Sequence, residues 1–155
     1  MGVNMTGNTE ENTQREQNLK TAGQLFSFIQ ASPSPFHAVA NMKRELDAHG
    51  YAQLLEGEEW RLEEEGKYYV IRNGSALIAF RIPKRDFTGF QIMASHSDSP
   101  SFKIKENPEM DVEGHYVKLN VEKYGGMLCA PWFDRPLSVA GRVIVRDGSR
   151  LVTRL

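Results

Sequence analysis

A single cysteine, Cys129, is present among the 155 residues, so no disulfide can form within the chain. Small secreted proteins commonly rely on disulfides, and the lack of one favours a reducing compartment, which we expect to be the cytoplasm. A lone cysteine is more often a small buried side chain than a nucleophile, and the sequence shows no catalytic partner for Cys129. Disulfide-stabilised and thiol-dependent classes of protein are therefore disfavoured.

Long hydrophobic runs and an excess of one charge are also missing. The longest apolar runs, around 76–80 and 90–94, are far shorter than the roughly 20 residues of a membrane-spanning helix. Residues 1–17 have no apolar centre and carry acidic side chains, unlike a signal peptide. With 19 basic and 20 acidic residues, the chain has no basic surface for nucleic acid or membrane. We expect a globular protein with neither of these partners.

The first third of the chain predicts a polar tail followed by two helices. Residues 1–16 are rich in Asn, Thr, Glu and Gln, bury too little apolar surface to order themselves, and are predicted to be disordered. Apolar residues recur at the helical period over 17–31, and the following Ser-Pro-Ser-Pro segment should end that helix. Ser34 is suited to cap a second helix over 35–49, and Gly50 is suited to end it.

Strands are predicted in the remaining two thirds. Residues 68–72 and 76–82 are rich in β-formers, and the Asn73-Gly74-Ser75 segment between them indicates a hairpin. The short apolar run at 90–95 has little alternation and predicts a strand buried on both faces of a sheet. Four later segments are strand-like, three of them alternating, and predict antiparallel β-structure: 102–105, 116–121, 142–146 and 151–155.

The change of pattern after residue 105 sets the predicted domain organisation. Helices, a hairpin and a buried strand indicate an α/β fold over 17–105, and the antiparallel segments indicate a β-rich part over 106–155. The chain ends within a predicted strand, with no closing helix or polar tail. We therefore expect it to be truncated.

The segment that follows the predicted buried strand, Ser95–Pro100, is the best candidate site. Ligands in open α/β sheets gather at the carboxyl ends of strands. In extended backbone His96 and Asp98 point to one face, so the imidazole could bind a metal while the carboxylate orders it, a water or another ligand. By spacing alone, a hydrogen-bonded structural histidine is the commoner outcome. The chain has only three other histidines and no HExxH or CxxC motif to complete a site.

Four segments in order along the chain resemble sequence blocks of the M18 family of metallo-aminopeptidases, the aspartyl aminopeptidase family. Ser32–Val39 is similar to the family's Ser-Pro-x-Pro-[Phe/Tyr]-His block, and His96–Lys105 is similar to His-[Thr/Ser]-Asp-Ser-Pro with its following strand. Tyr124–Gly126 resembles a Tyr-Gly-Gly block, and Trp132–Arg142 resembles Trp-x-Asp-Arg-x-Leu-x-x-Ala-Gly-Arg. Four ordered matches are specific, whereas any one alone would be modest.

This resemblance implies a zinc-dependent aminopeptidase that releases N-terminal acidic residues, Asp or Glu, from peptide substrates through a metal-activated water. It implies two Zn2+ ions per complete active site, with His96 as a metal ligand and Asp98 as the catalytic support residue. The substrate-binding residues stay unknown. Because the other ligands lie downstream in the family, we expect residues 1–155 alone to be inactive.

The resemblance also implies a fold and an assembly. Residues 17–105 would be the N-terminal part of an α/β/α zinc-peptidase catalytic domain. Residues 106–155 would be the start of a β-rich dimerisation insert. In the family, dimers of this kind assemble into a dodecamer, so a homo-oligomer is expected.

Two other functions stay open at this point. An M42-like glutamyl or deblocking aminopeptidase also uses a His-x-Asp motif, although the block at 132–142 argues against it. The chain could instead be an assembly module without activity, built from the β-rich part. Among the remaining candidate residues, His37 is expected to cap or pack a helix, and His115 is expected to lie on the surface.

Overall fold

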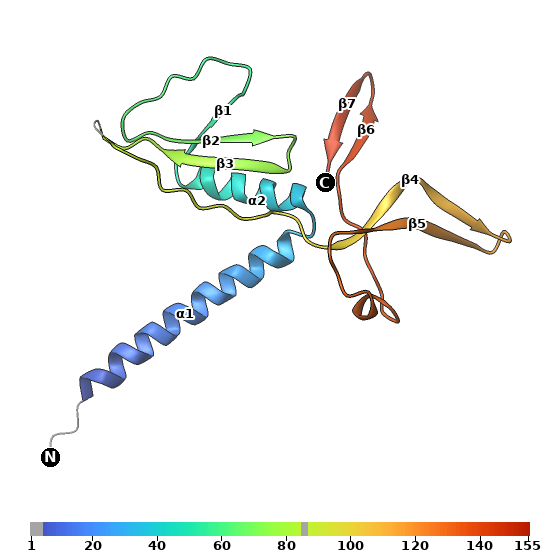
Figure 1. The fold of residues 1–155 in the computed structure, drawn as a ribbon, viewed down its shortest axis with the longest axis horizontal. Helices are drawn as coiled ribbons and strands as arrows, with labels where there is room; N and C mark the ends of the chain where they lie inside the picture. The colour runs from blue at the N-terminus through green and yellow to red at the C-terminus, as the bar shows by residue number, and fades with distance from the viewer. Residues whose placement is uncertain (1–4, 85–86) are drawn as a thin grey trace. The chain divides into compact units, whose positions relative to one another are not determined.

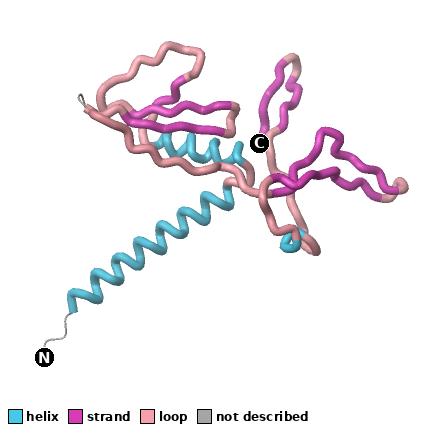
Figure 2. The backbone as a smooth tube through the Cα atoms, in the orientation of Figure 1, coloured by secondary structure: helices cyan, strands magenta, loops and turns pink. Residues whose placement is uncertain are grey.

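The computed structural model describes residues 5–84 and 87–155, and Figures 1 and 2 trace their helices and strands. The chain divides into two compact units. The first unit comprises Met1–Ser97 together with Gly141–Leu155, and the second unit is Asp98–Ala140.

Helix α1 spans Met5–Ala31 in the first unit. Residues 5–16 are thus helical, in contrast to the disorder expected for 1–16, and residues 1–4 lie outside the described range. The physical reason is local: no proline interrupts the segment, and polar side chains bond along the helix, as when Gln14 Nε2 donates to Asn18 Oδ1 at 2.9 Å. None of the described helices has both the length and the apolar character needed to cross a bilayer.

Helix α2 spans Pro35–Ala48 and begins where the sequence predicts. Ser34 has extended backbone, and its Oγ accepts a hydrogen bond from the His37 N–H at 3.4 Å. The same Oγ lies 2.7 Å from His37 Nδ1, so the imidazole also closes the cap. After the helix, Gly50 has a φ of 75°, the left-handed conformation that glycine adopts readily at a helix end. The predicted cap, the helix and the capping role of His37 are confirmed.

A three-stranded sheet follows, in the order β1-β2-β3 (Figure 1). Strand β1 is Ala52–Leu54 and runs parallel to β2, Lys67–Arg72, which pairs antiparallel with β3, Ala76–Arg81. Asn73 and Gly74 have φ values of 52° and 69° in the hairpin turn, which explains the Asn-Gly pair there. The predicted hairpin is confirmed, whereas β1 was too short to be predicted.

The core of the first unit lies between α2 and β2. Ala38 and Val39 from the helix and Tyr68 and Tyr69 from the strand are the buried apolar side chains of the described residues. Burial raises the pKa of the Tyr69 phenol, whose ring is fully enclosed. Figure 1 shows α2 running along one face of the sheet. The packing of a helix on a sheet agrees with the predicted α/β fold.

The prediction of a buried strand at 90–95 is wrong for this structure. Residues 87–97 form no helix or strand, and Phe90, Ile92 and Met93 are 79%, 83% and 94% exposed. A strand needs neighbours that satisfy its backbone groups and cover its faces, and no described strand pairs with this segment. The apolar composition that indicated burial is present, but nothing in the described residues covers it.

The later alternating segments form two hairpins, as predicted. Strand β4, Ser101–Val112, pairs antiparallel with β5, Tyr116–Tyr124, in the second unit. Strand β6, Val143–Asp147, pairs with β7, Arg150–Arg154, in the first unit. The structure therefore groups the last hairpin with the first unit, while the assignment of residues 106–155 to a dimerisation domain stays a prediction.

Candidate metal-ligand segment

His96 lies near the carboxyl end of segment 87–97, which forms no helix or strand, and its side chain is exposed. The next residue, Ser97, is half-buried, and its Oγ donates to the Ser75 carbonyl oxygen at 3.1 Å. Ser75 belongs to the β2–β3 turn. The segment that bears His96 is therefore tethered to this turn by a contact that spans 22 positions of sequence.

The same turn also holds Arg142. Arg142 Nη1 donates to the Asn73 carbonyl oxygen at 2.8 Å and to its side-chain Oδ1 at 3.2 Å. The guanidinium carbon lies 4.4 Å from the centre of the Phe36 ring, a cation–π contact. A side chain at Gly74 would contact both Phe36 and Arg142, at 3.8 and 3.9 Å. The first and last motif blocks, represented by Phe36 and Arg142, thus meet at the turn that anchors Ser97.

Asp98 opens the second unit and has a partner from the end of β5. The Tyr124 hydroxyl donates to Asp98 Oδ2 at 2.5 Å, a short bond of the kind that a carboxylate forms with an O–H donor. This hydrogen bond raises the pKa of the Tyr124 phenol, because loss of the proton would leave two negative charges facing each other. The carboxylate implied to support catalysis is therefore oriented by the tyrosine of the Tyr-Gly-Gly block.

Two further contacts join the same motif blocks in the second unit. Gly125 has a φ of 76°, and a side chain there would contact Pro100 at 3.5 Å. The Phe102 and Trp132 rings meet edge to face, with centroids 5.5 Å apart. Asp98 and Phe102 thus contact residues of the Tyr-Gly-Gly and Trp-x-Asp-Arg blocks, and Gly125 lies close to Pro100.

The described residues do not by themselves form a complete metal site. Over 5–84 and 87–155, no three His, Cys, Asp or Glu side chains are grouped so that they could hold a metal ion. Zinc in proteins takes four ligands, of which at least three come from side chains in a catalytic site. The exposed imidazole of His96 has the donor chemistry of one such ligand. The chain therefore fits zinc as one member of a donor set.

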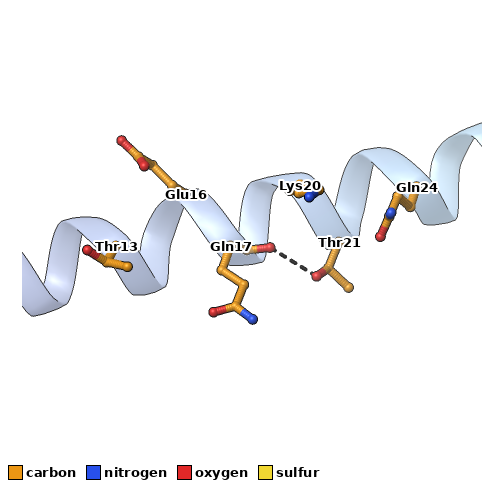
Figure 3. A pocket seen from close by; sticks show the side chains of 6 residues that line it. All are labelled: Thr13, Glu16, Gln17, Lys20, Thr21 and Gln24. Atoms are coloured by element: carbon orange, nitrogen blue, oxygen red, sulfur yellow. Dashed lines mark hydrogen bonds between the residues drawn. The ribbon is translucent and has the colours of Figure 1, made fainter.

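A shallow hollow along α1 offers no alternative site (Figure 3). Its lining comes from one helix and consists of polar side chains: Thr13, Glu16, Gln17, Lys20, Thr21 and Gln24. The Thr21 hydroxyl donates to the Gln17 carbonyl oxygen of its own helix at 2.9 Å. Side chains from a single helix face cannot enclose a substrate, so the hollow is ordinary helix surface.

Comparison with known proteins decides the family. The sequence model of the M18 family, described as an Aminopeptidase I zinc metalloprotease, matches residues 28–155. The chain belongs to the M18 family. The probable M18 family aminopeptidase 2 of Clostridium acetobutylicum is 52% identical over 135 residues, which cover 86% of this chain and 31% of that protein. The corresponding protein of Pseudomonas aeruginosa is 49% identical over 133 residues, with 84% and 31% covered.

Solved structures give the same M18 fold. Ape4, in a cryo-EM structure of the Ape4 and Nbr1 complex, aligns with a TM-score of 0.81 at 40% identity, over 86% of this chain and 26% of that one. The mApe1 dodecamer of S. cerevisiae aligns with a TM-score of 0.76 at 29% identity, over 86% and 32%. The recognition of an M18 chain with an α/β fold is confirmed. The chain spans about 31% of the length of the curated M18 relatives it matches.

Proposed function

We propose that this chain, extended to the length of its M18 relatives, is a zinc-dependent aminopeptidase. The observation that carries the proposal is the exposed imidazole of His96, two positions along the chain from the Asp98 carboxylate, which accepts the Tyr124 hydroxyl. Membership of a family described as zinc metalloproteases supports zinc as the metal. In this proposal His96 is a metal ligand and Asp98 is the support residue.

The chemistry divides between the metal and the chain. A zinc ion, when bound, would act as a Lewis acid and lower the pKa of a bound water molecule to about 7. His96 contributes a nitrogen donor, and Ser97 fixes the backbone beside it through the Ser75 carbonyl. Asp98, accepting the Tyr124 hydroxyl, presents an oriented carboxylate two residues away. Since one imidazole cannot retain zinc alone, we expect residues 1–155 by themselves to be inactive.

The finer features of the function are also proposals. We propose peptides with N-terminal Asp or Glu as substrates and two zinc ions in the complete site. Similarity to a chain solved as a dodecamer supports a homo-oligomer, with residues 106–155 contributing to a dimerisation domain. The single cysteine supports a reducing compartment, and we place the protein in the cytoplasm.

The test compares extended chains that differ at one histidine. Purified wild type is expected to release Asp and Glu from chromogenic aminoacyl substrates faster than Leu. His96→Ala is expected to lower kcat/KM by about 100-fold or more, because a zinc ligand is lost. His115→Ala is the matched control, since His115 is exposed in the turn before β5, and its activity should equal wild type.

Three results would contradict the proposal in different ways. Full activity of His96→Ala would remove His96 from the site. A preference for Leu over Asp would support the M42-like alternative. A wild-type chain that assembles but hydrolyses none of the substrates would support the assembly module.

A further inference from the structure

We infer that Tyr124 is a positioning residue of the active site and that it acts by holding the Asp98 carboxylate. This inference rests on the proposed function, in which Asp98 supports the metal centre. It adds Tyr124, from the Tyr-Gly-Gly block, to the residues proposed for the site.

The strand register explains how Tyr124 reaches Asp98. Tyr124 is the last residue of β5 and is paired with Ser101, the first residue of β4. Asp98 lies three positions before Ser101, so the long phenol side chain extends past the end of the hairpin to meet it. The two oxygens are 2.5 Å apart across 26 positions of sequence. Asn, Ser or Thr in place of Tyr would be too short for this contact.

The chain around Tyr124 is built to keep the phenol in place. Gly125 turns the backbone with a φ of 76°, and its position against Pro100 brings the residue after Tyr124 beside the residues after Asp98. The edge-to-face contact between Phe102 and Trp132 further restricts the start of β4. Tyrosine has few rotatable bonds, so a fixed backbone fixes the hydroxyl at low entropic cost.

The contact is suited to positioning rather than to packing. The Tyr124 ring is 43% exposed, so it fills no core, while its hydroxyl forms the charge-assisted bond to Asp98 Oδ2. A carboxylate bound at one oxygen is restricted in rotation and presents its other oxygen in a defined direction. Partners of this kind, one step removed from a metal, commonly change metal affinity or activity by about 10- to 100-fold.

A double-mutant cycle in the extended chain tests the inference. The four proteins are wild type, Tyr124→Phe, Asp98→Ala and the double variant, and each is assayed for kcat, KM and zinc affinity by competition with a chromogenic chelator. Tyr124→Phe removes one hydroxyl and keeps the ring. Tyr116→Phe is the matched control, because Tyr116 lies at the other end of β5 and is 71% exposed.

We expect Tyr124→Phe to lower kcat and zinc affinity by about 10-fold each, with KM changed by less than about twofold. In the Asp98→Ala background the same substitution should change zinc affinity by less than about twofold, because the acceptor of the hydrogen bond is already absent. An effect of equal size in both backgrounds would overturn the inference, and so would wild-type values in Tyr124→Phe. If wild type itself releases no amino acid, the proposed function fails and this inference fails with it. If wild type is active and Tyr124→Phe equals it, only this inference fails.

Discussion

Removal of the Tyr69 hydroxyl probes a hydrogen-bonded group on a buried side chain of the first unit. Tyr69 is fully buried, its hydroxyl donates to Asp47 Oδ1 at 2.7 Å, and it accepts from Lys43 Nζ at 2.9 Å. Lys43 and Asp47 also bond each other at 2.7 Å and are 41% and 48% exposed. In Tyr69→Phe the Lys43 and Asp47 side chains therefore remain paired with each other, and water can replace the lost hydroxyl as their hydrogen-bond partner. We expect the free energy of local unfolding to fall by about 1.5 kcal/mol, the lower end of the range for a hydrogen bond to charged groups.

Removal of the whole side chain sets the scale for this prediction. Tyr69→Ala loses the ring as well as the hydroxyl, and burial of an aromatic ring is worth about 3–5 kcal/mol in such substitutions. Hydrogen exchange followed by mass spectrometry reports local opening, so peptides covering α2 and β2 give the change without requiring cooperative unfolding of the whole chain. Tyr116→Phe, at an exposed position of the second unit, should change those peptides by less than about 0.5 kcal/mol.

The comparison between the two Tyr69 variants shows whether the ring or the hydroxyl holds α2 against the sheet. If Tyr69→Phe cost as much as Tyr69→Ala, the hydroxyl rather than the ring would hold α2 against the sheet. If neither variant increased exchange in α2 or β2, the contact between helix and strand would not stabilise the first unit, and the described core would be wrong.

Two further predictions follow from contacts of the motif blocks. Arg142→Lys should lower the free energy of local opening of the β2–β3 turn by about 1 kcal/mol. An ammonium cannot reproduce the planar contact of the guanidinium with Phe36 together with its bonds to Asn73. Faster hydrogen exchange of the turn amides would show the loss. The Tyr124 phenol should ionise above its usual pKa of 10.0, because its proton is shared with Asp98. Since the folded pKa is raised, the stabilisation is present below about pH 10 and is lost as pH rises through the folded pKa. Absorbance at alkaline pH, compared between wild type and Tyr124→Phe, measures this directly, and ionisation at the ordinary value would contradict the hydrogen bond.

Local chemistry made part of this structure predictable. Ser34 before Pro35 specifies a capped helix start, because a side-chain acceptor and a fixed φ act within one turn. Asn73-Gly74 specifies a hairpin, because both residues tolerate positive φ. The His96 and Asp98 candidates likewise came from a short motif, and the match of the M18 family to residues 28–155 confirms the recognition that motif supported.

Partners distant in sequence could not be predicted in the same way. The apolar run at 90–95 indicates a need for burial but not which strand would provide it, and in this structure none of the described strands does. The composition of residues 5–16 indicates that they bury little, but a polar segment without proline can still be helical. The bonds from Ser97 to Ser75 and from Tyr124 to Asp98 join residues more than 20 positions apart, so no local pattern reveals them.

The zinc content of the extended chain shows whether His96 is a metal ligand. Metal analysis of purified wild type and His96→Gln, after equilibration with limiting zinc and removal of loosely bound ions, compares proteins that differ by one nitrogen donor. We predict that wild type retains zinc and that His96→Gln retains substantially less. Equal retention of zinc by the two proteins would contradict the assignment of His96 as a metal ligand.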